Sequence, residues 1–298
     1  MTHFDGRFAR RCDGLSRAAA ARWGGELFAP PSVCRRAAGT QPSGTGDYAC
    51  GDDYRYVDWN RAARLDELVS RQFLGNERRR IMLLLDVSAS MSIGQPAKFD
   101  SARELVAALG YASLRSCDEV SAACFSESVS ACLGPLYGAA GAARLFRFLN
   151  GLKTQSGITS LLSAATSVAR RTDEPDLAVI VSDLLDPRGW EQALHLLRGR
   201  GYDVHVVQYY SPEDARPQLA RRVHLEDAET DEVIAATIEE RDIANYVAVF
   251  QEFCRSIRSF CAGLGLACSQ VCSDVPLARA FSSIASSSRK LRLTRMIA

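Results

Sequence analysis

From Arg80 onward, apolar and polar residues alternate in blocks, a pattern typical of strands separated by amphipathic helices. The strongest block is an unbroken apolar run, Ile81–Leu85, which ends in Asp86. A run of this length is typical of a strand that is buried on both faces of a parallel sheet. The following segment, Lys98–Ser116, repeats its apolar residues at helical spacing and predicts a crossover helix.

The same rhythm continues to the end of the chain and predicts a doubly wound, mostly parallel α/β sheet. A short turn joins two of the strands, Glu119–Phe125 and Val129–Leu133, and predicts an antiparallel hairpin at one edge. The other expected strands are Leu177–Ser182, Asp203–Gln208 and Ala267–Val271, and the other helices are Ala142–Leu152, Ser160–Arg171, Trp190–Arg198 and Asp242–Leu264.

Two parts of the chain depart from this rhythm. Residues 1–79 are expected to form an N-terminal arm, with a helix over Phe8–Trp23 and a proline- and glycine-rich break over Ala29–Gly46. The sheet domain is expected over residues 80–298. It contains a surface hairpin inserted at about residues 213–240.

The composition narrows the function classes. The chain has 36 basic and 35 acidic residues, which argues against bulk attraction to nucleic acid or an anionic membrane. No segment approaches the ~18 apolar residues of a membrane span, and the first residues lack a signal-peptide core, so we expect a cytoplasmic protein without a membrane span. The ten cysteines form no CxxC pair with a nearby histidine cluster, and we expect free thiols.

Oxygen-bearing side chains follow the predicted strand ends. Asp86, Ser88 and Ser90 come at alternating positions after the apolar run, Thr159 lies in a loop that begins a helix, and Asp183 follows a later strand. If the two strands are parallel neighbours, these five side chains converge at one sheet edge. Two carboxylates and three hydroxyls suit a hard cation such as Mg²⁺, with Mn²⁺ or Ca²⁺ as alternatives. We therefore predict a metal site with a position open for a partner's carboxylate or for water.

Each residue also has a purely structural interpretation. An aspartate at a strand end often forms a turn, Ser88 or Ser90 could cap the next helix, and Thr159 could be an ordinary N-cap. A third interpretation is a phosphohydrolase with Asp86 as its nucleophile. Such an enzyme needs a second acid two residues later, where this chain has Ser88, so we expect no enzyme activity.

The segment Asp86–Ser90, together with Thr159 and Asp183, resembles the metal-ion-dependent adhesion site of von Willebrand factor A domains. The resemblance implies that the hydroxyls of Ser88, Ser90 and Thr159 bind the metal directly, and that Asp86 and Asp183 act through water. The threonine loop of such domains often reads Gly-Gly-Thr; here isoleucine takes the middle position.

Upstream, the sequence GDDYRYVDW over Gly51–Trp59, followed by Ala63-Arg64, resembles the signature of a bacterial family called domain of unknown function fifty-eight. The segment Gly44–Tyr48 is similar to a second motif of that family, with Asp47 and Tyr48 in place of glutamate and phenylalanine. This resemblance implies a partner of the MoxR-type AAA+ ATPase class, in a chaperone-like system that assembles or activates other proteins.

The main hypothesis is thus a divalent-cation-dependent protein-binding module whose partner supplies an acidic residue to the metal. An alternative is metal-independent scaffold binding through the surface of Gly51–Arg64, and a less favoured one is a Mg²⁺-dependent phosphohydrolase. Gly51–Arg64 has two interpretations: a docking surface with Tyr54, Tyr56 and Trp59 as aromatic anchors, or a structural clamp of Asp–Arg pairs.

Overall fold

The computed structural model divides into two compact units, Met1–Phe28 with Arg80–Ala298, and Ala29–Arg79. Each unit is described by itself. The expected arm of residues 1–79 is thus divided between them. The residues that the structure describes are 4–23, 33–34, 41–47, 57, 59, 63–64, 69–75, 79–116, 118–170, 177–186, 189–218, 222–229 and 233–286.

A six-stranded sheet forms the centre of the larger unit. Its strands are β4 (Arg80–Asp86), β5 (Glu119–Phe125), β6 (Val129–Leu136), β7 (Leu177–Ser182), β8 (Asp203–Tyr210) and β11 (Ala267–Cys272). They lie in the order β11-β8-β7-β4-β5-β6, all parallel except β6, which pairs antiparallel with β5. The predicted fold class, a doubly wound and mostly parallel sheet, is confirmed.

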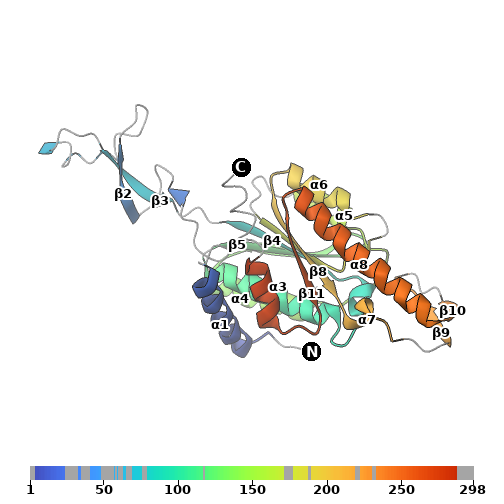
Figure 1. Ribbon diagram of the computed structural model, residues 1–298. Helices are drawn as coiled ribbons and strands as arrows, with labels where there is room; N and C mark the ends of the chain where they lie inside the picture. The colour runs from blue at the N-terminus through green and yellow to red at the C-terminus, as the bar shows by residue number, and fades with distance from the viewer. Residues whose placement is uncertain are drawn as a thin grey trace. The chain divides into compact units, whose positions relative to one another are not determined.

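Helices cover both faces of this sheet (Figure 1). One face carries α1 (Gly6–Trp23), α3 (Lys98–Arg115) and α4 (Gly138–Asn150), and the other carries α5 (Leu161–Ala169), α6 (Glu191–Gly199) and α8 (Glu240–Gly263). A further helical segment, residues 277–286, packs into the hydrophobic core that α1, α3 and α4 form with the sheet.

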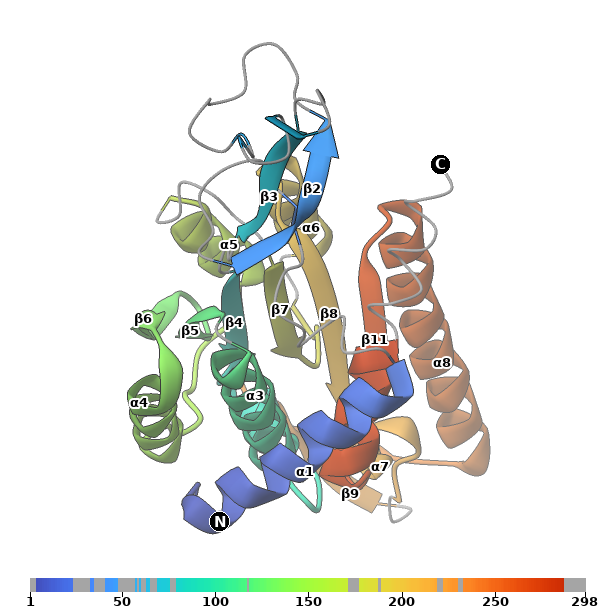
Figure 2. The same cartoon turned by 90° about the vertical axis from the view of Figure 1, so that its left-hand side faces the viewer.

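Strand β4 shows why an unbroken apolar run suits the middle of the sheet, where it lies between β5 and β7 (Figure 2). Leu83 and Leu85 face the core that contains α3, whereas Leu84 faces the core that contains α5 and α6. All three are buried. Each buried leucine stabilises the fold by about 2 kcal/mol, so this strand holds the residues at its carboxyl end in a fixed position.

Several element boundaries differ from the expected ones; the largest difference is in α4, which begins at Gly138 rather than Ala142. Helix α1 begins at Gly6 rather than Phe8, because Asp5 Oδ1 accepts hydrogen bonds from the backbone N–H groups of Arg7 and Phe8 and so caps the helix. Strand β6 continues to Leu136, which pairs with β5 and is buried.

The predicted surface hairpin is present as β9 (Arg222–Glu226) and β10 (Val233–Thr237), which pair with each other in a two-stranded antiparallel sheet. Helix α7 (Pro212–Ala215) precedes it. No helix in the described ranges has both the length and the apolar character needed to cross a lipid bilayer.

The smaller unit contains a three-stranded antiparallel sheet, β1-β3-β2, formed by β1 (Val33–Cys34), β2 (Gln41–Asp47) and β3 (Val69–Gly75). Within Gly51–Arg64, the structure describes residues 57, 59, 63 and 64. Val57 is buried and Trp59 is 59% exposed. Tyr54, Tyr56 and the aspartates of the hypothetical clamp lie outside the described residues.

Candidate functional site

The strand order of the central sheet reverses between β4 and β7. From β4 the chain continues outward to β5 and β6, then returns to the other side of β4 and continues through β7, β8 and β11. Open α/β sheets bind their ligands in the crevice at such a reversal, beyond the carboxyl ends of the strands. Asp86 is the last residue of β4 and Asp183 directly follows β7, and both are buried at this place.

The three alternating polar residues that begin with the last residue of β4 form one hydrogen-bonded turn. Asp86 Oδ1 accepts a 2.9 Å hydrogen bond from the backbone N–H of Ser88, and the hydroxyls of Ser88 and Ser90 lie 3.0 Å apart in a further hydrogen bond. Ser90 belongs to the short 3₁₀ helix η2 (Ala89–Ser92). A carboxylate and two hydroxyls are thus held together in a buried turn.

Ser182 completes the surroundings of Asp86, and the sequence did not single it out. Its hydroxyl donates a 2.6 Å hydrogen bond to Asp86 Oδ2 and accepts one from the backbone N–H of Leu184. The pairing of Leu85 with Val181 places Ser182 beside Asp86. A hydroxyl at the end of the neighbouring strand is the signal that could have identified it.

The turn after β7 is strained. Leu184 has a φ of 61°, in the left-handed region that a branched side chain adopts at a cost of roughly 1–2 kcal/mol. Its N–H bond to Ser182 and its buried side chain hold it there. Such strain is often found at functional sites, where the surrounding structure maintains it.

Asp183 is bound by a buried lysine that the sequence placed only at a helix start. Lys98 Nζ lies 2.9 Å from Asp183 Oδ2 and 3.0 Å from Asp214 Oδ2, and Lys98 is fully buried. Burial alone would lower the pKa of Lys98, but the charges of Asp183 and Asp214 outweigh it and the pKa is raised. Lys98 is therefore a buried cation that is held in place by Asp183 and Asp214.

Asp86 has no such partner among the described lysines and arginines. Burial raises the pKa of Asp86 to about 7, and the charge of Asp183 adds to this shift, against the opposing hydrogen bonds from Ser182 and Ser88. A buried carboxylate without a cation is costly. The oxygen donors present at this edge therefore fit a bound cation.

Thr159 lies in a loop that is attached to the segment after β4. The backbone N–H of Gln155 donates to the carbonyl of Val87 at 2.6 Å, and Ser88 forms a parallel bridge with Gln155. In the described part of the chain, no hydrogen bond joins Thr159 to the other four candidate residues. Its N–H and hydroxyl instead donate to the two carboxylate oxygens of Glu229, at 3.1 and 2.6 Å.

The capping alternatives are wrong for three of the five residues. Ser160, not Thr159, is the N-cap of α5, accepting a hydrogen bond from the N–H of Ser163. Ser88 occupies the N-cap position of η2, but its side chain makes no capping hydrogen bond there, and α3 begins only after Ala97, so neither Ser88 nor Ser90 caps it. Asp86, in contrast, does form a turn, because its carboxylate accepts the hydrogen bond from the Ser88 backbone, and it also lies at the candidate site.

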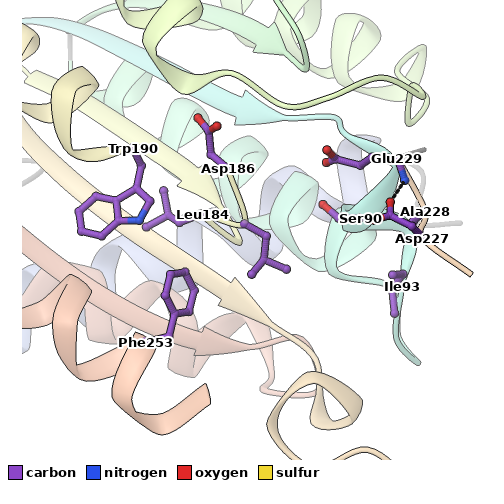
Figure 3. A pocket seen from close by; sticks show the side chains of 10 residues that line it. Ser90, Ile93, Leu184, Asp186, Trp190, Asp227, Ala228, Glu229 and Phe253 are labelled. Atoms are coloured by element: carbon purple, nitrogen blue, oxygen red, sulfur yellow. Dashed lines mark hydrogen bonds between the residues drawn. The ribbon is translucent and has the colours of Figure 1, made fainter. Parts of the chain in front are cut away.

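A cavity of about 520 Å³ lies beside these residues (Figure 3). Ser90 and Glu229 line it and direct their oxygens into it, and Leu184, Trp190 and Phe253 supply apolar walls. Within the described ranges, no three His, Cys, Asp or Glu side chains cluster as a metal site of that type would require. The site is instead rich in hydroxyls, with two carboxylates.

A family model described as "Protein of unknown function DUF58" matches residues 45–252. The uncharacterized protein Rv1480 of Mycobacterium tuberculosis is 26% identical over 196 residues, which cover 64% of this chain and 62% of that protein. The chain therefore spans less than two thirds of the length of this relative.

Two solved structures are similar at low sequence identity. One is the conserved hypothetical protein BatB from Bacteroides thetaiotaomicron, with 16% identity and a TM-score of 0.46, covering 72% of this chain and 99% of that one. The other is a von Willebrand factor type A protein from Catenulispora acidiphila, with 12% identity and a TM-score of 0.44, covering 73% of this chain and 44% of that one.

Proposed function

The chain belongs to the DUF58 family, and from that premise we propose that it is a protein-binding module whose binding depends on a divalent cation held at the carboxyl ends of β4 and β7. The observation that carries the proposal is the buried Asp86 carboxylate. It is hydrogen-bonded by Ser88 and Ser182 but forms no ion pair with a described lysine or arginine.

Five residues would hold the cation. Ser88, Ser90 and Thr159 would offer hydroxyl oxygens, and Asp86 and Asp183 would offer carboxylates. This donor set suits Mg²⁺, with Mn²⁺ or Ca²⁺ as alternatives, because hard cations prefer oxygen ligands. When bound, the cation supplies a positive charge and a coordination position for an acidic side chain of the partner.

The chain's own residues keep this arrangement rigid. Ser182 fixes one oxygen of Asp86 and the Ser88 backbone fixes the other, while Lys98 fixes Asp183. Supporting hydrogen bonds of this kind orient metal ligands and tune their affinity. We propose binding rather than catalysis because Ser88 occupies the position where a phosphohydrolase of this strand pattern needs an acid.

We further propose that the partner is a MoxR-type AAA+ ATPase, and that the pair assembles or activates other proteins. This rests on the family resemblance of the Gly51–Trp59 segment. The test is capture of purified MoxR-type ATPase from the same source by immobilised chain. Capture in Mg²⁺ that EDTA abolishes supports the proposal, and equal capture in both contradicts metal dependence.

One observation favours a second candidate, metal-independent binding through Gly51–Arg64. Trp59 is 59% exposed, as an aromatic anchor for a partner would be. In that case Trp59→Ala would abolish capture while Asp86→Ala would leave it unchanged. The opposite result supports the metal-dependent function.

A further inference from the structure

The carboxylate of Glu229 is bound to Thr159, one of the five candidate metal ligands. Both of its oxygens accept hydrogen bonds from Thr159, which lies 70 positions away in the sequence. The backbone N–H of Glu229 in turn donates to Asp227 Oδ1 at 2.8 Å, which shapes the tip of the β9–β10 hairpin. Glu229 is therefore fixed both through its carboxylate and through its backbone N–H.

Apolar packing does not explain why the hairpin tip lies here. The hairpin forms its own sheet, separate from the central one, and Leu225, Val233 and Ile234 are 42%, 59% and 63% exposed. The tip residues Asp227 and Glu229 instead line the same cavity as Ser90. A polar contact at the site thus accounts for its position better than burial does.

The charges at this place also need explanation. Glu229 binds Thr159 beside a cavity that Ser90 also lines, and among the described residues no lysine or arginine forms an ion pair with Glu229. A cation bound by Ser90 and Thr159 would therefore attract the charge of the Glu229 carboxylate. The hydroxyl of Thr159 can donate to Glu229 and still offer a lone pair to a cation.

We propose that Glu229 is a resident carboxylate of the metal site, delivered by the hairpin to the position that a partner's acidic side chain must take. The inference rests on the proposed function. It makes the β9–β10 hairpin an internal competitor: the partner's carboxylate binds by displacing Glu229 from the site. Removing the Glu229 carboxylate opens the position to water or to a free carboxylate.

The experiment uses Mn²⁺ and the full chain. Mn²⁺ affinity is measured by calorimetry. The number of water molecules coordinated to the bound Mn²⁺ is followed by the relaxation rate of water protons. For Glu229→Gln we expect about tenfold weaker Mn²⁺ binding, as for loss of other groups that support metal ligands, and faster relaxation per bound Mn²⁺. Added acetate should then slow relaxation in Glu229→Gln and have little effect in the wild type.

Two further variants serve as controls. Glu252→Gln removes the same charge from an exposed ion pair with Arg255 and should match the wild type. Asp227→Asn keeps Glu229 but weakens the turn that holds it, and should give an intermediate change.

The outcomes separate the two proposals. If Mn²⁺ binds the wild type and Glu229→Gln with equal affinity and equal relaxation, the role of Glu229 is wrong and the metal site stands. Weaker binding without a change in relaxation also overturns it, because Glu229 would then only support the fold. If the wild type binds no Mn²⁺, both proposals fail.

Discussion

The hydroxyl of Ser182 donates a 2.6 Å hydrogen bond to Oδ2 of Asp86 and so joins the carboxyl ends of β7 and β4. Both residues are buried, so the bond fixes the carboxylate in the direction that the turn after β4 requires. It also connects the two strands between which the sheet order reverses. The site is therefore built on the ends of two adjacent central strands rather than on loops alone.

Ser182→Ala should affect both stability and metal affinity. Asp86 Oδ2 would be left buried without its donor, which costs about 1–3 kcal/mol of unfolding free energy. Mn²⁺ affinity should fall by about tenfold, because Asp86 would be less well oriented. Denaturant unfolding and Mn²⁺ calorimetry measure the two effects. The exposed Ser256→Ala is the control, and equal values for both variants would refute the role of Ser182.

Lys98→Met should strongly destabilise the protein. The change leaves the carboxylates of Asp183 and Asp214 without their shared cation, and breaking a buried ion pair costs about 3–5 kcal/mol. Arg255→Met, which breaks an exposed ion pair with Glu252, should cost less than about 1 kcal/mol. Denaturant unfolding compares the two. A loss at Lys98 no larger than that at Arg255 would show that the buried pairs are not formed.

His205 should make stability depend on pH. Its side chain is buried beside the hydroxyl of Ser269, and burial lowers its pKa from 6.5 to about 4. Between these values the unfolded chain binds more protons than the folded one, so stability falls as the pH drops from 6.5 to 4. A shift of this size corresponds to about 3 kcal/mol.

His205→Gln keeps a hydrogen-bonding group but cannot titrate. The unfolding free energy of the wild type should therefore fall more steeply than that of the variant between pH 6.5 and pH 4, as measured by urea unfolding at several pH values. Parallel curves would mean that the pKa of His205 is the same in the folded and the unfolded protein, and so that its side chain is not buried as described.

Much of the fold could be predicted because its signals are local. The apolar run of β4, the helical spacing of α3 and the short β5–β6 turn each follow from neighbouring residues, and each is present. The grouping of Asp86, Ser88 and Ser90 was predictable for the same reason. Their role as metal ligands remains a prediction.

The supporting residues could not be found in this way. Ser182 depends on the register of two strands, Lys98 on the folding of a helix start into the core, and Glu229 on where a distant hairpin lies. Likewise, nothing local indicates that Phe4 and Phe8 bury themselves against Phe146 of α4. These are relationships between segments, which only the three-dimensional structure displays.

A calorimetric titration of Mn²⁺ into the metal-free chain and into Asp86→Ala tests whether the candidate site binds a divalent cation. We expect one bound Mn²⁺ per wild-type chain and none in the variant, with circular dichroism showing that both are folded. Absence of Mn²⁺ and Mg²⁺ binding to the folded wild-type chain, or equal binding to folded Asp86→Ala, would contradict this expectation.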